Sequence, residues 1–186
     1  MDKRKLILDA ALKLFVEFGF HATPTSKIAK EANVANGTLF HYFLTKDDLI
    51  LALFTEIKKE MSIYISKNSS HKKSFKNVLM GMYLAYLNWA LENNTEYKFI
   101  QQFQNSPFLS LIAATEIQIQ NQPYLDLLNK GIEEKVLKPM PVDLLYILVS
   151  SHTAGIHQYL TTHKLSKTEQ NKVVNEAVEL LWDMIT

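Results

Sequence analysis

The chain has 186 residues, of which 47% are hydrophobic and 21% charged, with only five glycines and five prolines. This composition excludes a disordered, collagen-like or low-complexity protein and is typical of an ordinary globular chain. The lack of cysteine excludes disulfides, thiolate metal sites, iron–sulfur clusters and cysteine nucleophiles. Neither a signal peptide nor a membrane span is expected from the sequence, so we expect a cytoplasmic location.

The net charge of +1 conceals an asymmetry along the chain. Residues 1–46 hold seven Lys and Arg against four Asp and Glu, whereas residues 47–186 hold thirteen against fifteen. The first segment is the basic one, as expected of a part that faces a polyanion.

The spacing of the hydrophobic residues predicts helices throughout, beginning with one over residues 3–18 that Gly19 caps. Thr23 and Pro24 then fit the N-cap and first residue of a short second helix. Asn33 suits the sharp turn after that helix, because asparagine tolerates the left-handed conformation.

The remaining elements are also predicted to be helices. A short third helix covers residues 36–43, and the capping box at Thr45 to Asp48 begins a fourth that runs to about residue 68. Pro123 is expected to kink or split the seventh, and Ser166 to Glu169 form a capping box for the ninth. The five later helices are predicted at about residues 71–92, 96–104, from 108 onward, 142–162 and 167–184. The fold class is therefore all-α, with nine helices.

Two short helices joined by a three-residue turn are typical of a helix-turn-helix. Ala29 is small enough for the helices to cross closely, and Val34 and Leu39 fill the angle between them. This arrangement turns the rest of the third helix outward, in position to enter a major groove. The outward residues are Asn36, Gly37, Thr38, Phe40, His41 and Tyr42.

Residues 5–50 closely resemble the tetracycline-repressor (TetR) family. The resemblance is carried by Ile7, Ala10-Ala11, Leu14-Phe15, Gly19-Phe20, Thr23, Ile28-Ala29, Ala32, Val34, Gly37 to Phe40, Tyr42-Phe43, Lys46 and Leu49. It implies a homodimeric, all-helical transcription regulator, usually a repressor that a small molecule releases from a palindromic operator. The residues show no catalytic, phosphate-loop or metal-ligand motif, so neither a cofactor nor a metal is expected. Domains are expected at residues 1–46, for DNA binding, and 47–186, for effector binding and dimerisation.

The resemblance also assigns DNA contacts. Thr25, Ser26 and Lys27 open the second helix near a phosphate, and Lys46 takes the family's usual phosphate contact. From the chemistry of the side chains, Asn36 can pair with adenine, and Thr38 can meet a thymine methyl or a base edge. Ala35 replaces the usual capping serine of the third helix, and Phe40 replaces the usual tyrosine, which removes one hydroxyl contact to phosphate.

The fifth predicted helix is apolar on two faces, and the face rich in Tyr and Met either lines an effector cavity or packs in a plain core. Glu116 is the only charged residue between Lys98 and Asp126. It either selects a cationic or hydrogen-bond-donating ligand, or reaches water at a rim. The candidate effector residues are Met61, Tyr64, Tyr83, Tyr86, Trp89, Phe103 and Glu116.

The last two predicted helices suit a symmetric four-helix dimer interface, because small residues on one and a broad apolar face on the other invite a partner. An intrachain core is the alternative. The candidate interface residues are Ser151, Ala154, Gly155, Val174, Val178 and Leu181. His152 and His157 are poorly spaced for chelation and are interpreted as buried or interface histidines. Regulation by a protein partner without a pocket, and an all-helical enzyme, remain the other hypotheses.

Overall fold

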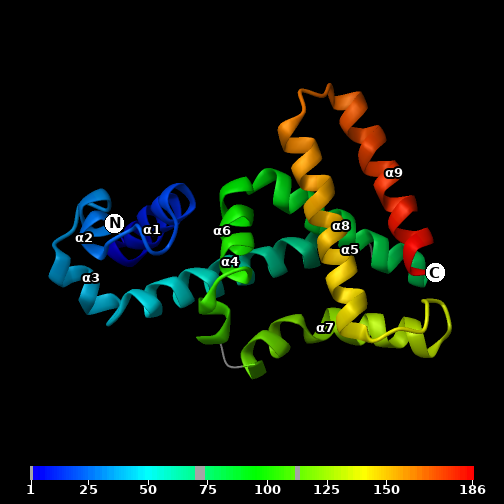
Figure 1. Ribbon diagram of the computed structural model, residues 1–186, viewed down its shortest axis with the longest axis horizontal. Helices are drawn as coiled ribbons and strands as arrows, with labels where there is room; N and C mark the ends of the chain where they lie inside the picture. Colours follow the sequence, from blue (N-terminus) through cyan, green and yellow to red (C-terminus); the bar gives the residue numbers. More distant parts are fainter. Residues whose placement is uncertain (1, 70–73, 112–113) are drawn as a thin grey trace. The chain divides into compact units, whose positions relative to one another are not determined.

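The computed structural model describes residues 2–69, 74–111 and 114–186, without the side chains of residues 111–120. Within these residues the chain is all-α, with nine α-helices, one 3-10 helix and no strand (Figure 1). The helices are α1 Lys3–Phe18, α2 Thr25–Glu31, α3 Asn36–Tyr42, α4 Lys46–Asn68, α5 Phe75–Glu92, α6 Asn94–Gln104, η1 Pro107–Leu111, α7 Ala114–Glu133, α8 Val142–Thr162 and α9 Lys167–Ile185. The predicted fold class is confirmed.

Local capping explains why several helices begin and end as predicted. Gly19 has a φ of 79° and donates its N–H to Phe15 O at the end of α1. The capping box of α4 is reciprocal, because Thr45 N donates to Asp48 and Asp48 N donates to Thr45 Oγ1. Ser166 and Glu169 form the same motif at α9.

Pro123 breaks the chain less than the sequence predicted. Helix α7 runs from Ala114 through Pro123 to Glu133, so the proline does not split it. Leu128 of α7 is fully buried in an apolar cluster.

The chain divides into two compact units, and the first combines Met1–Glu60 with Asn93–Glu116. In this unit α1 packs against α2, α3 and α6. Phe99 of α6 is fully buried and lies with its ring centroid 5.6 Å from that of Phe20. Aromatic packing thus attaches α6 to the helix-turn-helix, a grouping that differs from the predicted division after residue 46, which stays a prediction.

The second unit combines Met61–Glu92 with Ile117–Thr186. Helices α8 and α9 form a hairpin, and α5 packs against both of them (Figure 1). Gly131 permits a close approach, because a Cβ at this position would lie 2.4 Å from Phe75 Cζ. The core consists of Leu79, Met80, Tyr83, Leu87, Leu128, Leu137, Leu145, Val149, Leu181 and Ile185.

Candidate nucleic-acid interface

Helices α2 and α3 form a helix-turn-helix held by its backbone. Asn33 takes a φ of 53°, as predicted for the turn, and Val34 N donates to Ala29 O at 2.9 Å. Ala29 and Leu39 are 2% and 0% exposed, so the inner faces of both helices are closed. The outer face of α3 is consequently fixed by a rigid scaffold.

The predicted capping role of Thr23 is wrong. Pro24 occupies the N-cap of α2, without a side-chain capping bond. Thr23 is fully buried, and its hydroxyl donates to Leu14 O at 3.2 Å and to Gly19 O at 2.8 Å. The inward-facing hydroxyl is thus hydrogen-bonded in a dry environment, as buried polar groups require.

The outer face of α3 presents the residues that the sequence analysis selected. Asn36, Gly37, Phe40, His41 and Tyr42 are exposed. Thr38 is half-buried, so it is the least accessible member of this face. As expected from the sequence, Ala35 gives α3 no side-chain cap. The rings of Phe40 and Tyr42 are 39% and 41% exposed.

The residues of α2 that are predicted to contact a phosphate differ in exposure, and the lysine among them already has a partner. Ser26 is exposed, and Thr25 and Lys27 are half-buried. The Lys27 ammonium lies over the Phe18 ring, 3.2 Å from its centroid. This cation–π contact orients Lys27 and was missed by the sequence analysis, because Phe18 belongs to another helix.

Lys46 is tied to the scaffold in a way that the sequence did not reveal. Its Nζ donates to the backbone carbonyl of Phe20, and burial lowers the pKa of the ammonium from its ordinary value. The contact fastens the beginning of α4 to the segment between α1 and α2. A phosphate contact by Lys46 remains a prediction, and the other two N–H donors of the ammonium could make it while the bond to Phe20 O is kept.

The candidate effector residues are distributed over both compact units. Phe103 belongs to the first unit, where it is fully buried and stacks on Phe54 with ring centroids 4.1 Å apart. Tyr83, Tyr86 and Trp89 belong to the second unit, and Tyr86 stacks on Trp89 with centroids 6.4 Å apart. Their role in effector binding stays a prediction.

The polar groups among these candidates have specific partners. The Tyr83 hydroxyl lies 3.0 Å from His152 Nδ1, and Tyr64 donates to Glu92 Oε2 at 2.9 Å. Met61 is 9% exposed on α4. The side chain of Glu116 lies outside the described part of the structure, so its predicted orientation stays open.

The two histidines of α8 are engaged within the second unit. His152 meets Tyr83, and burial lowers its pKa. His157 is 5% exposed, with its Nε2 3.2 Å from Ala90 O. Among the residues that the structure describes, no three His, Asp or Glu side chains gather as a possible metal site.

Leu181, which was predicted to lie in the dimer interface, faces the interior of the protomer. Leu181 is fully buried in the core of the second unit, because α9 turns this face toward α5 and α8. Val174 and Val178 pack partly against the same core. Ser151 and Gly155 are exposed, and Ala154 is half-buried. The inner and outer faces of α9 cannot be told apart from the hydrophobic pattern, because both carry apolar residues.

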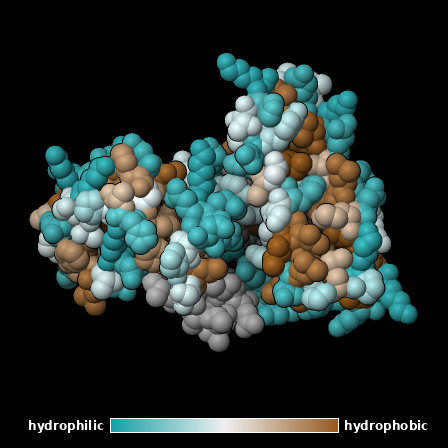
Figure 2. Space-filling model, viewed as in Figure 1, coloured by the Kyte–Doolittle hydropathy of each residue, from teal (hydrophilic) through white to brown (hydrophobic). Residues whose placement is uncertain are grey.

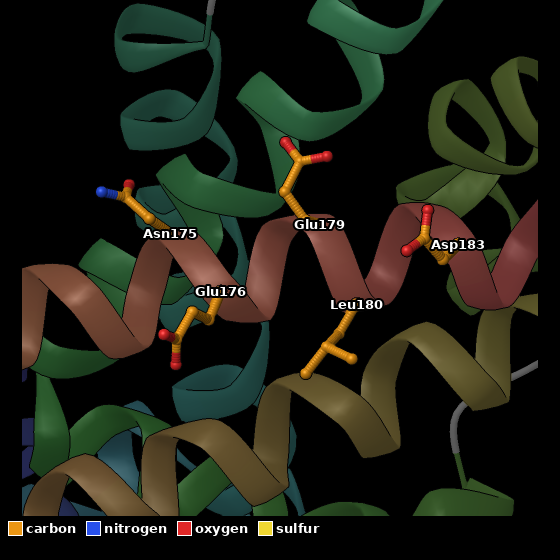
Figure 3. Close-up of a pocket in the computed structure, with 5 residues that line it drawn as sticks. All are labelled: Asn175, Glu176, Glu179, Leu180 and Asp183. Carbon is orange, nitrogen blue, oxygen red and sulfur yellow. The ribbon is translucent and has the colours of Figure 1, made fainter.

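The outer face of α9 carries a shallow surface depression. Leu180 is 62% exposed and points to the same side of α9 as Glu176, whereas Glu179 points to the opposite side (Figure 3). All the lining residues come from this one helix: Asn175, Glu176, Glu179, Leu180 and Asp183. The depression is therefore part of the outer surface of α9, which differs from an enclosed effector cavity.

A helix-turn-helix with an accessible second helix, at the beginning of an all-α chain, defines a DNA-binding transcription regulator. Two family models match this chain: "Bacterial regulatory proteins, tetR family" over residues 7–53, and "Tetracyclin repressor-like, C-terminal domain" over residues 50–186. The chain belongs to the TetR family of transcriptional regulators. Its relatives and structural neighbours are regulators and not enzymes.

Two curated relatives extend over most of the chain. An HTH-type regulator of Bacillus subtilis, YhgD, is 28% identical over 169 residues, covering 88% of this chain and 87% of its own. The repressor KstR2 of Mycobacterium tuberculosis is 27% identical over 158 residues, covering 82% and 78%.

The fold has equally extensive neighbours among solved structures. A putative TetR-family regulator from Shewanella sp. PV-4 superposes with a TM-score of 0.91 at 28% identity, covering 100% of this chain and 98% of that one. A regulator from Marinobacter aquaeolei superposes with a TM-score of 0.84 at 21% identity, covering 98% and 95%. No helix within the described ranges is both long and apolar enough to span a bilayer.

Proposed function

We propose that the protein is a homodimeric repressor that binds a palindromic operator and leaves it when a small-molecule effector binds. The observation that carries this proposal is the uncovered outer face of α3 on a closed helix-turn-helix scaffold. The similarity to KstR2, a transcriptional repressor, favours repression.

Dimerisation is proposed through the outer faces of α8 and α9. Leu144, Ile147 and Tyr159 of α8 are 45%, 57% and 42% exposed, and Leu180 of α9 is also exposed. Hydrophobic patches lie along these two helices in Figure 2. Contiguous exposed apolar surface of this kind is typical of a protein interface. Two symmetry-related hairpins would bury it as a four-helix interface.

The effector is proposed to be a largely apolar molecule that contacts the aromatic side chains of the second unit, Tyr83, Tyr86 and Trp89. Aromatic side chains offer apolar area together with polar tips, which suits such a ligand. A ligand carbonyl or hydroxyl would compete for the hydrogen bond between Tyr83 and His152. Glu116 is proposed to favour a cationic or hydrogen-bond-donating group.

Helix α4 is the proposed connection between effector and operator. It begins at Lys46, which is bonded to the helix-turn-helix, and continues to Met61 and Tyr64. A ligand acts as an inducer only if it binds better to the dimer shape that cannot fit adjacent major grooves. A coupling free energy of about 1–3 kcal/mol between the two sites is typical of such regulators.

To test DNA binding, purified protein is mixed with genomic DNA fragments, and the fragments that the protein retains are sequenced. A shared palindrome among them would be the candidate operator. Affinity for the palindrome should fall steeply with salt, because phosphate neutralisation supplies much of the energy. Asn36→Ala should cost about 1–3 kcal/mol at one base position, whereas Lys46→Ala should weaken binding to all sequences about equally. The melting temperatures of both variants show whether weaker binding comes from a lost DNA contact or from destabilisation of the protein, for example at the beginning of α4. Parental binding by both variants would contradict the proposed surface.

The dimer claim is tested with Gly155→Trp. A Cβ at Gly155 meets no atom within 4 Å in the protomer, and Gly155 is exposed, so the new side chain begins on the surface proposed to meet the partner. Sedimentation of this variant should then report monomers, and circular dichroism should show unchanged helicity. A stable dimer of this variant would point to a different interface.

The effector claim is tested by thermal shift against a compound library, followed by titration of each hit into the protein–operator complex. An inducer should raise the melting temperature and lower operator affinity. Hits that stabilise the protein without affecting operator binding would contradict the proposed coupling.

A further inference from the structure

The outer face of α3 carries no ammonium or guanidinium group. The seven residues of helix α3 are Asn-Gly-Thr-Leu-Phe-His-Tyr, and only Leu39 among them is buried. The face therefore offers one amide, two hydroxyls, one imidazole and two aromatic rings to a base edge.

The lysines of the surrounding scaffold are directed elsewhere. Lys27 lies over the Phe18 ring at 3.2 Å, and Lys46 is bonded to the Phe20 carbonyl. Lys30 is exposed in the last turn of α2. In a helix-turn-helix the first of the two helices crosses the DNA backbone, so a lysine there meets phosphates and not bases. We therefore expect these lysines to contact the DNA phosphates, while the side chains of α3 contact the bases.

This separation determines which base pairs α3 can distinguish. The commonest specific contact to guanine is a bidentate Arg or Lys on O6 and N7, and α3 has neither residue. Asparagine instead pairs with adenine N6 and N7, and apolar groups contact the thymine methyl. His41 can donate to a purine N7, but adenine and guanine share that acceptor, so this bond does not select guanine.

We infer that the base pairs contacted by α3 are A·T pairs, with adenine read by Asn36 and thymine methyls read by Phe40 and Thr38. The inference rests on the proposed function, because it takes α3 as the element that enters the major groove.

Gly37 supports the same inference from packing. It is exposed in the middle of this face, and a Cβ there would meet nothing within 4 Å. The protomer does not require glycine at this position, although glycine weakens a helix relative to alanine. A missing side chain does leave room for a base edge with a projecting methyl group.

The first experiment is selection of the full-length protein's preferred sites from a randomised duplex library, with footprinting to locate the half-sites. Enrichment of A·T pairs at the protected major-groove positions is expected. Enrichment of G·C pairs there would overturn the inference and leave the proposed function standing. Failure to enrich any sequence would instead overturn the proposed sequence-specific binding.

The second experiment replaces thymine by uracil at single positions of the selected site, which removes only the methyl group. Each contacted position should weaken binding about fourfold, the equivalent of one buried methyl group. Phe40→Ala should bind thymine and uracil duplexes equally at the position that Phe40 reads. Equal binding of both duplexes by the parent protein at every position would overturn methyl recognition.

The third experiment exchanges the amide for the missing guanidinium. Asn36→Arg should move the preference from adenine to guanine at one position. Asn171→Arg adds the same charge to an exposed site on α9 and should leave the preference unchanged. An unchanged preference in Asn36→Arg would show that Asn36 does not read the base.

Discussion

Lys58 offers a quantitative test of how α4 is built. Its side chain is 9% exposed, beside Phe54 and Ile57, which are 4% and 3% exposed on the same helix. Burial lowers the pKa of the ammonium from 10.5 to about 8. Folding therefore disfavours the charged form, whatever contacts Lys58 makes. We predict that Lys58→Met, which keeps the length of the side chain, stabilises the protein at neutral pH.

The size of the effect follows from the two pKa values. A fall from 10.5 to about 8 corresponds to a penalty of about 3 kcal/mol for the charged form. Methionine loses the contacts of the ammonium and does not pack perfectly, so the expected gain at pH 7 is about 1–3 kcal/mol.

The pH dependence has a definite sign. Between pH 8 and 10.5 the unfolded state binds more protons at Lys58 than the folded state, so the contribution of Lys58 to wild-type stability rises with pH in this window. Below the folded pKa the penalty is complete, and above the unfolded pKa it is absent. The advantage of Lys58→Met should therefore be largest at pH 7 and shrink as the pH approaches 10.

Urea unfolding at a fixed protein concentration, followed by circular dichroism from pH 7 to 10, measures this difference. Other titrating groups are the same in both proteins and cancel. Lys59→Met is the matched control, because Lys59 is the exposed neighbour on α4, and it should change stability little. A Lys58→Met protein that is less stable than wild type at pH 7, or a gain that does not change with pH, would refute the reasoning.

Three further predictions concern the helix-turn-helix. Thr23→Val removes the hydrogen bonds of a buried hydroxyl to Leu14 O and Gly19 O and should lower the free energy of unfolding by about 1–3 kcal/mol in urea titrations. Gly37→Ala should raise stability by up to about 1 kcal/mol yet weaken operator binding in fluorescence anisotropy; tighter binding would contradict a close approach of DNA. Phe18→Leu removes the cation–π contact of Lys27 and should weaken binding to all duplexes about twofold to fivefold, with Phe18→Trp restoring it.

Much of the local structure was readable from the sequence because its causes are local. Hydrophobic spacing, the capping boxes at Thr45 and Ser166, and the left-handed Asn33 each depend on residues a few positions apart. The face of α3 was predictable for the same reason, since burying Leu39 turns its helical neighbours outward.

Contacts between distant residues were decided only by the tertiary structure. Thr23 bonds carbonyls of α1 in place of capping α2, and Lys46 reaches back to Phe20. No periodicity records such pairs, because each depends on how separate helices pack.

Burial on two-sided helices was also undetermined by the sequence. Leu181 and Leu180 are adjacent and chemically identical, yet one is fully buried and the other is 62% exposed. Hydrophobicity gave both residues the same preference for the interior. The direction in which α9 faces α5 and α8 decided which of them belongs to the core of the protomer.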